Sequence, residues 1–525
     1  MENPDSLVEY GFRRGIIVLM AVLCALLEIV DTTIVNVALD SMKGSLGVTL
    51  EDVAWVVTAY AIANVIMVPM TAWLSQQFGR RNYFVASIIV FTAASFLCGN
   101  STSMAELIIF RFIQGLGGGA LLVTSQTIIT EIFPVEKRGM AQAIYGMGVI
   151  VGPTLGPPLG GYIVDNFSWP YIFYINIPLG IIAALLAMNF VKSPRYGEKR
   201  KPSEVDWWGI ILLSTSVGSL QYVLEHGQQD DWFNDKIILI LSIVTVLSAI
   251  FFLWRELTAK YPIVNLRVLK NTNLAVGTVL TFVLGFGLYG STFIVPIYTQ
   301  SILGWTATDA GLLLVPSSIM TGIMMPIIGK LLQKGVPQKY LVTLGFAIFF
   351  LYSLAMYYEM TPYTSTDEFF WPLVIRGVGL GLLFVPITTL SLSSLKGREI
   401  AEGAAFTGMM RQLGGSFGIA IITTYIARDS QKHRVNLMAH VDITKDIVAQ
   451  RIQMYQQMMM SKGATAQEAL GRAYKLLEGQ VMKQAMVLTY ADVFLYLGIL
   501  FLICIPFVLS IKQGKSKINP ADAAH

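Results

Sequence analysis

The chain has 525 residues, of which 54% are hydrophobic and 13% are charged, and its net charge is +4. Soluble domains contain about 25% charged residues, so this composition excludes an ordinary soluble enzyme, a disordered scaffold and a basic nucleic-acid-binding protein. The three cysteines, Cys24, Cys98 and Cys504, lie inside apolar segments, which excludes a disulfide framework. The sequence therefore predicts an all-α polytopic membrane protein.

Apolar segments long enough to cross a bilayer recur along the whole chain. A hydrocarbon core of about 30 Å requires about 20 mostly apolar helical residues, and the backbone groups of a segment in lipid must be satisfied within it. This length criterion finds about fourteen segments. Each is therefore predicted to be a helix. They lie near 16–38, 52–74, 83–100, 105–130, 140–164, 169–191, 207–225, 237–255, 273–298, 308–333, 339–358, 370–393, 400–426 and 485–511.

Basic residues concentrate in alternate loops, as in the pairs Arg13–Arg14 and Arg80–Arg81. Cytoplasmic loops carry an excess of Lys and Arg, so both termini are predicted to be cytoplasmic. The predicted organisation is a six-helix bundle (1–191), a cytoplasmic linker (192–206), a two-helix insertion (207–256), five helices of a second bundle (257–426), a long periplasmic helical loop (427–484), the last membrane helix (485–511) and a cytoplasmic tail (512–525).

The two predicted six-helix groups share a weak internal repeat. Arg111 in the fourth segment and Arg376 in the twelfth each lie within a membrane segment and precede closely spaced glycines. Two similar halves are typical of transporters, whose substrate site lies near the midplane between the halves. The count fits a 6+2+6 arrangement.

The first segment carries two carboxylates, Glu28 and Asp31, where an ionised group costs at least about 2.5 kcal/mol. Helical spacing places both on one face with Thr32 and Asn36, so this face is predicted to border a cavity. Such a carboxylate can exchange protons, and Arg111 is predicted to pair with one and tune its protonation. The alternative is a purely structural salt bridge.

Glycines recur at every fourth residue of the fifth segment, and prolines interrupt the same helix. This stripe lets another helix approach closely, and the prolines bend the backbone. The segment is predicted either to gate the cavity or only to pack against a neighbouring helix. The residues concerned are Gly148, Gly152, Pro153, Gly156, Pro157, Gly160 and Gly161.

Gly79, Arg80 and Arg81 end one helix and begin the next at the cytoplasmic side. They anchor the loop by the positive-inside rule and are also predicted to form a conformational latch. The predicted substrate cavity is lined by Thr32, Asn36, Tyr60, Asn64, Gln114, Tyr289, Tyr298, Met320 and Arg411.

No enzymatic activity and no cofactor are expected, with protons as the coupling ion. The glycine-rich segment 115–120 lies inside a membrane span and follows no strand, so it is not a nucleotide loop. The four histidines show no metal-ligand spacing, so no metal site is predicted.

Four segments together carry a family resemblance: IVDTTIVNVAL (29–39), RFIQGLGGG (111–119), the glycine-proline element (148–161) and WPYIFYINIPLG (169–180). Over nearly its whole length the chain resembles the major facilitator superfamily, and within it the fourteen-helix drug:proton antiporters of the EmrB and QacA type. The long loop before the last helix is similar to that of the EmrB branch. One departure is Gln76, which stands where the cytoplasmic loop motif of the family has an aspartate.

The resemblance implies proton-coupled efflux of hydrophobic or amphiphilic drugs, and hence antibiotic resistance, by alternating access. It also implies a multi-pass protein of the cell inner membrane that works with a periplasmic membrane-fusion adaptor and an outer-membrane channel in a tripartite pump. Two alternatives stay open: a dedicated exporter of one metabolite, siderophore or lipid-like compound, and a membrane receptor or scaffold that transports nothing.

Overall fold

The computed structural model describes residues 7–194, 205–442 and 444–510, and every regular element in these ranges is a helix. Thirteen helical segments there are long and apolar enough to cross a membrane. The more polar α15 (Arg398–Met438) is a further long helix that packs against α10 and α17 inside the bundle. The expectation of an all-α membrane fold is therefore confirmed. Residues 195–204 of the predicted linker and the predicted tail 512–525 lie outside the described residues.

The first half of the chain forms a bundle in which α6 and α7 together make one crossing. Its helices are α1 (Gly11–Leu46), α2 (Leu50–Phe78), α3 (Arg80–Gly99), α4 (Met104–Ile132), α5 (Arg138–Asn166), α6 (Tyr171–Tyr174) and α7 (Asn176–Phe190), and the 3-10 turn η1 (Val135–Lys137) precedes α5.

Two helices of an insertion follow, and then the second bundle. The insertion comprises α8 (Trp207–His226), η3 (Trp232–Asn234) and α9 (Lys236–Thr258). The second bundle comprises η4 (Leu266–Lys270), α10 (Thr272–Tyr298), the π-turn η5 (Thr299–Leu303), α11 (Ala307–Leu312), α12 (Val315–Gln333), α13 (Gln338–Glu359), α14 (Thr366–Ser393), α15, α16 (Asp446–Ser461) and α17 (Ala466–Ser510).

Side-chain caps fix where several of these helices begin. The Thr49 hydroxyl accepts a hydrogen bond from the backbone N of Asp52 at 3.1 Å, and the Asp52 carboxylate accepts one from the backbone N of Thr49. The two bonds form a capping box at the start of α2. Ser103 caps α4 by accepting from the backbone N of Glu106, and Asn271 caps α10 by accepting from the backbone N of Asn273 and Leu274, in both cases without the reciprocal contact. These caps satisfy backbone donors that have no partner within the helix, so the short loops end where the membrane segments begin.

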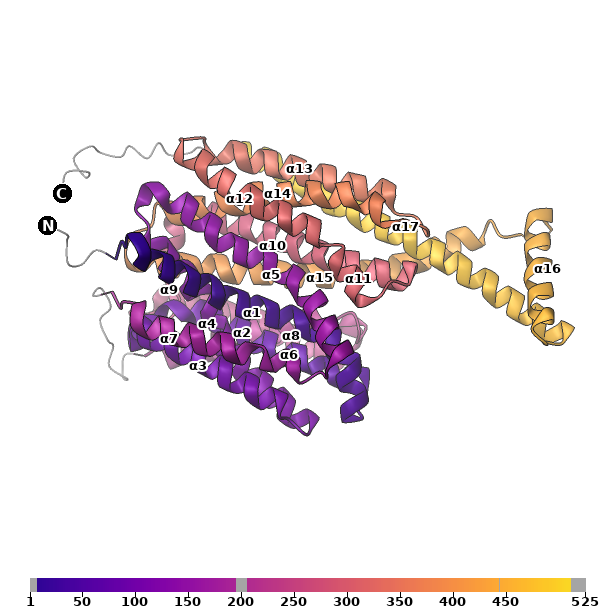
Figure 1. Cartoon of the computed structure of the whole chain (residues 1–525), viewed down its shortest axis with the longest axis horizontal. Coiled ribbons are helices and arrows are strands. Elements are labelled where there is room, and N and C mark those ends of the chain that lie inside the picture. Colours follow the sequence, from indigo (N-terminus) through magenta and orange to yellow (C-terminus); the bar gives the residue numbers. More distant parts are fainter. Residues whose placement is uncertain (1–6, 195–204, 443, 511–525) are drawn as a thin grey trace.

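The two halves meet along α5, which lies between α1 of its own half and α12 of the other (Figure 1). A second contact between the halves is formed by α2 and α15, and the insertion helix α8 packs against both of these helices. The insertion therefore lies at one seam between the halves.

An extension built from the end of α15, α16 and the beginning of α17 projects beyond the bundle, at the end opposite to the one where α1 begins and α17 ends (Figure 1). The predicted loop 427–484 is thus largely a continuation of two membrane helices, with breaks at 439–445 and 462–465. Gly463 has a φ of +89°, a left-handed conformation that favours glycine, at the turn between α16 and α17.

Candidate functional site

A hydrogen-bonded network surrounds Asp31 in the first bundle. The Asp31 carboxylate accepts hydrogen bonds from Arg111 Nη1 at 2.6 Å, Gln114 Nε2 at 2.9 Å and Asn176 Nδ2 at 2.7 Å. Neither Asp31 nor Arg111 exposes more than 1% of its side chain. The membrane helices α1, α4 and α7 therefore converge on one buried carboxylate whose charge is balanced by one guanidinium.

Arg111 is held in this network by four contacts besides its ion pair with Asp31. Its Nε donates to the backbone carbonyl of Val56 at 3.1 Å, and its Nη1 also donates to Gln114 Oε1 at 2.7 Å. The guanidinium lies 4.2 Å from the ring centroid of Tyr60 and 5.6 Å from that of Phe173. A cation over aromatic faces is stabilised without losing its charge, so Arg111 has favourable contacts besides Asp31.

Sequence reasoning missed two members of the network, Asn176 and Ser95. Ser95 Oγ accepts hydrogen bonds from Gln114 Nε2 at 2.6 Å and from Asn176 Nδ2 at 3.1 Å. The only sequence signal for Asn176 is its place in the WPYIFYINIPLG segment, where it is the single amide among apolar and aromatic residues. Ser95 carries no such signal, because serines are common in membrane helices.

Glu28 does not join this network although it lies one helical turn from Asp31. Its Oε1 accepts a hydrogen bond from Asn64 Nδ2 at 2.9 Å, and Arg411 of the second half is close enough to interact with it electrostatically. Arg411 is 2% exposed, its Nη1 has no hydrogen-bond partner, and its guanidinium lies 5.8 Å from the Phe384 ring. The two carboxylates of α1 thus have separate environments, one within the first bundle and one facing the second half.

A cavity of about 160 Å³ lies between the two halves. Five of its walls come from helices α1, α2, α4, α10 and α15, and the sixth comes from the insertion helix α8. Four of the predicted cavity residues line it: Thr32, Tyr60, Tyr289 and Arg411. Glu28 and Arg111, which were predicted as proton-coupling residues, also border the cavity.

Two polar residues of α8, Gln221 and Glu225, line the same cavity, and sequence reasoning did not single them out. Gln221 Nε2 donates to Glu225 Oε1 at 2.7 Å, and Ser416 Oγ of α15 donates to Gln221 Oε1 at 3.0 Å. Glu225 is an ionisable residue in an apolar helix, as Glu28 is, so the sequence could have indicated it as a cavity residue for the same reason.

The other predicted cavity residues lie elsewhere. Asn64 and Gln114 do not line the cavity. Asn64 donates a hydrogen bond to Glu28, and Gln114 donates one to Asp31. Asn36 is an exposed residue of α1 and does not line the cavity. Tyr298 lies inside the second bundle, where its hydroxyl donates to the Thr361 carbonyl and its ring packs on Phe369.

Met320, the remaining predicted cavity residue, packs between α12 and α14. A Cβ on Gly377 would lie 2.9 Å from the Met320 Cβ, so the small glycine makes room for this side chain. Its role in the structure is packing within the second bundle.

The glycine stripe of α5 faces α1 of the same half. A Cβ on Gly152 would lie 2.5 Å from Ile29 Cγ2, and one on Gly160 would lie 3.0 Å from the Ile34 carbonyl oxygen. An adjacent face of α5 contacts the second half, where a Cβ on Gly161 would lie 2.6 Å from Thr308 Oγ1. The helix therefore packs closely both against the carboxylate-bearing helix α1 and against the second half.

Of the two arginines in the predicted cytoplasmic latch, only Arg80 forms an ion pair in the described part of the chain. Arg80 is buried and forms a two-point ion pair with Glu131 at the end of α4, in which Nη2 lies 2.9 Å from Oε1 and Nη1 contacts Oε2. Arg81 has an exposed side chain, and its backbone N donates to Ser193 Oγ at 3.1 Å. Gly79, with φ of +83°, makes the turn between the two helices.

The buried arginine of the second half, Arg376, has no carboxylate within ion-pair distance in the described part of the chain. It donates instead to Ser291 Oγ at 2.9 Å, Ser317 Oγ at 3.0 Å and Thr292 Oγ1 at 2.5 Å. The two halves are thus unlike in chemistry, because only the first places a titratable carboxylate against its central arginine.

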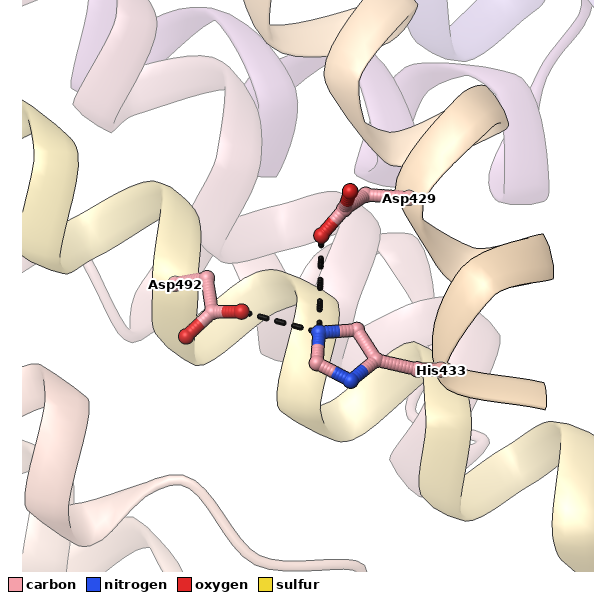
Figure 2. A group of neighbouring side chains, drawn as sticks. All are labelled: Asp429, His433 and Asp492. Carbon is pink, nitrogen blue, oxygen red and sulfur yellow. Dashed lines mark hydrogen bonds and ion pairs between the residues drawn. The ribbon is translucent and has the colours of Figure 1, made fainter. Parts of the chain in front are cut away.

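A polar cluster joins α15 to α17 at the base of the extension. Figure 2 shows His433 of α15 between Asp429 of the same helix and Asp492 of α17, with His433 Nε2 at 3.5 Å and 2.8 Å from their carboxylates. The donor atoms of the three side chains lie within 4.8 Å of one another, a proximity that the sequence did not predict. Lys432 Nζ lies 2.8 Å from Asp429 Oδ1, so a side-chain cation already neutralises this carboxylate.

Comparisons with known proteins agree with this architecture. The model of the Major Facilitator Superfamily matches residues 21–419. The chain is 34% identical over 519 residues to the multidrug export protein EmrB of Escherichia coli, covering 98% of each chain. It is 33% identical to the fatty acid resistance protein FarB of Neisseria gonorrhoeae, covering 93% of this chain and 94% of the relative.

A solved structure is similar in fold alone. The crystal structure of the human organic anion transporter MFSD10 (TETRAN) matches with a TM-score of 0.55 at 13% identity, over 93% of this chain and 99% of that chain.

Proposed function

The chain belongs to the major facilitator superfamily, in the EmrB branch, and we propose that it exports hydrophobic or amphiphilic drugs in exchange for protons. It is a multi-pass efflux transporter of the inner membrane, and its relatives match it over nearly their whole length. The observation that carries the proposal of proton exchange is the fully buried Asp31, which is paired with Arg111 beside a cavity between the halves.

Protonation of Asp31 changes the balance of charge inside the membrane. Ionised Asp31 and Arg111 form a neutral pair, whereas protonated Asp31 leaves the Arg111 guanidinium uncompensated in a medium of low dielectric constant. The Tyr60 and Phe173 rings offer Arg111 alternative contacts, and Gln114 and Asn176 still bind the neutral acid. Proton binding therefore favours a different arrangement of α1 and α4, which is what coupling to a conformational change requires.

The cavity supplies contacts for an amphiphilic substrate. Glu28 and Arg411 present charges of opposite sign, and Tyr60, Tyr289 and the neighbouring aliphatic residues present apolar surface. Coupling follows when substrate and proton prefer opposite states of the transporter, because each then weakens the binding of the other. The α5 helix, packed on α1 and on α12, would carry this change between the halves.

We also propose that the extension formed by α15, α16 and α17 binds a periplasmic membrane-fusion adaptor, with an outer-membrane channel beyond it. The extension projects past the bundle (Figure 1), and Ile447 of α16 is 77% exposed, with Met454 and Met458 also exposed. Exposed apolar side chains on a helix are suited to a partner helix. A photo-crosslinker at Met458 should capture a co-expressed adaptor, whereas one at the exposed Tyr340 on α13 should not.

The proposed exchange is tested with purified protein in proteoliposomes, a fluorescent cationic dye and an imposed pH gradient. We expect dye movement in the wild type and its loss in Asp31→Asn, with dye binding retained. The matched control is Asp40→Asn, which changes an exposed carboxylate on the same helix. Unchanged transport in Asp31→Asn would reject Asp31 as the proton site, and Glu28→Gln would then be the next variant.

If the wild type moves no dye under any gradient, with or without an adaptor, multidrug export by this chain is rejected. The dedicated export of one metabolite, siderophore or lipid-like compound would then explain the same fold. That outcome would be separated from inactive protein by the dye-binding measurement in detergent.

A further inference from the structure

The insertion helix α8 is fixed to both halves of the transporter. On one side, the His226 ring stacks on Tyr222 with centroids 4.6 Å apart, lies 5.5 Å from the Trp55 ring of α2, and bonds to Thr58 at 3.2 Å. On the other side, Gln221 accepts the hydrogen bond of Ser416. Its position relative to the cavity is therefore determined by contacts with α2 and α15 together.

Glu225, which α8 brings to the cavity, lacks among the described residues the cationic partner that the other carboxylates there have. Arg111 is paired with Asp31, and Glu28 has Asn64 as a donor and Arg411 as a nearby cation. None of the ion pairs in the described ranges includes Glu225.

The described part of the protein offers Glu225 neutral donors and no cation. Its Oε1 accepts from Gln221 Nε2 at 2.7 Å, and the Thr58 hydroxyl of α2 also interacts with the carboxylate, whereas the buried Oε2 has no partner at hydrogen-bond geometry. A buried carboxylate without a paired cation is unfavourable in a membrane protein, and such groups usually serve a bound ion, proton or substrate. The hydrogen-bond chain from Ser416 through Gln221 orients this carboxylate at the cavity wall.

We propose that Glu225 is a substrate-binding residue that takes the positively charged group of an amphiphilic organic cation. The inference rests on the proposed export function and assigns a substrate class and an insertion-helix residue to the same cavity. The cation pairs with Glu225 Oε2, and its apolar body lies against Tyr289, Val57 and Ile419 of the cavity wall. Aromatic faces add a favourable contribution to cation binding. The insertion helix α8 thus contributes to substrate recognition besides packing at a seam between the halves.

The test compares two ions of nearly equal shape and opposite charge, tetraphenylphosphonium and tetraphenylborate. Equilibrium binding of each radiolabelled ion is measured on the purified full-length protein in detergent. Glu225→Gln keeps the size of the side chain and removes its charge, so we expect the Kd for tetraphenylphosphonium to rise about tenfold or more. The Kd for tetraphenylborate should stay within about twofold of the wild type or fall.

The matched control is Glu136→Gln, which changes an exposed carboxylate in the turn before α5 and should leave both constants unchanged. If Glu225→Gln does not fold, Gln221→Leu removes the amide that orients Glu225, and the Kd for the cation should rise about threefold or more. Wild-type affinity for the cation in a folded variant of either kind would overturn the proposal.

Failure of this inference is distinguishable from failure of the proposed function. Wild-type protein that moves tetraphenylphosphonium along a pH gradient, together with a Glu225→Gln variant that binds it equally well, rejects only the role of Glu225. Wild-type protein that neither binds nor moves the cation rejects the assigned substrate class, while the dye experiment decides proton-coupled export itself.

Discussion

Arg111 Nη1 lies 2.6 Å from Asp31 Oδ2, and this ion pair joins α4 to α1 in a part of the bundle that has essentially no solvent exposure. Breaking a buried ion pair by removing one partner leaves an uncompensated charge and costs about 3–5 kcal/mol in soluble proteins. The pair is thus both a structural contact and a charge balance that one proton can change.

Arg111→Gln should lower the thermal stability of the detergent-solubilised protein more than the double variant Asp31→Asn/Arg111→Gln does. The single change leaves ionised Asp31 without its cation, whereas the double change leaves two neutral groups that can bond to each other. Differential scanning fluorimetry measures both. Arg81→Gln, which alters an exposed arginine, is the control. A double variant with lower thermal stability than the single variant would show that the balance of charge between Asp31 and Arg111 does not determine the stability of this site.

Gly156→Ala should abolish most transport, and Gly148→Ala should leave it nearly unchanged. A Cβ on Gly156 would overlap Thr33 Oγ1 and lie 3.1 Å from the backbone N of Ile34, so α1 and α5 would have to separate. A Cβ on Gly148 would lie 3.3 Å from Val22 Cγ1, which would have to shift by a few tenths of an ångström, and 3.6 Å from the Val22 carbonyl oxygen, which is an ordinary contact distance. Initial rates of gradient-driven dye transport measure the difference. Equal rates for the two variants would argue against close α1–α5 packing as a requirement for transport.

Glu131→Gln should loosen the cytoplasmic ends of α3 and α4. It removes the carboxylate that pairs with buried Arg80 and leaves the guanidinium with weaker acceptors. Hydrogen–deuterium exchange at the end of α4 should become faster by about tenfold if the pair contributes about 1.4 kcal/mol to local stability. Glu136→Gln, a few residues further along the chain, should not change the exchange rate.

The cluster at the base of the extension should weaken only in acid. Burial alone would raise the pKa of Asp429, but the hydrogen bonds from Lys432 and Tyr425 and the nearby positive charge outweigh it and hold this pKa below its ordinary value. A carboxyl whose pKa is lowered on folding stabilises the folded state above its unfolded pKa, about 3.9, and loses that contribution as the pH falls through the folded pKa.

Exchange protection of residues 427–438 should accordingly be constant between about pH 5 and pH 8 and decrease below about pH 4. Asp429→Asn should reduce the protection at neutral pH and remove its dependence on acid in this range. A decrease of protection in the wild type already between pH 6 and pH 7 would contradict the assignment to Asp429.

Much of the candidate site could be predicted from ionisable residues that lie within membrane helices. Glu28, Asp31, Arg111 and Arg411 are ionisable groups in apolar helices, and lipid makes each of them unfavourable unless a partner or a cavity is present. The structure places all four in or beside the cavity between the halves. Tyr298 and Met320 carry no such constraint, because tyrosine and methionine pack equally well in a bundle interior.

The sequence by itself determined the class of molecule, the positions of the apolar helices and the ionisable groups within them, since each of these depends on the free energy of transfer of nearby residues into lipid. The partners of those charges were decided only by the tertiary structure. Asp31 meets Asn176, Arg80 meets Glu131, and Glu225 reaches the cavity because of how α1, α4, α7 and α8 pack. Helical periodicity tells which residues share a face of one helix, but not which other helix that face meets.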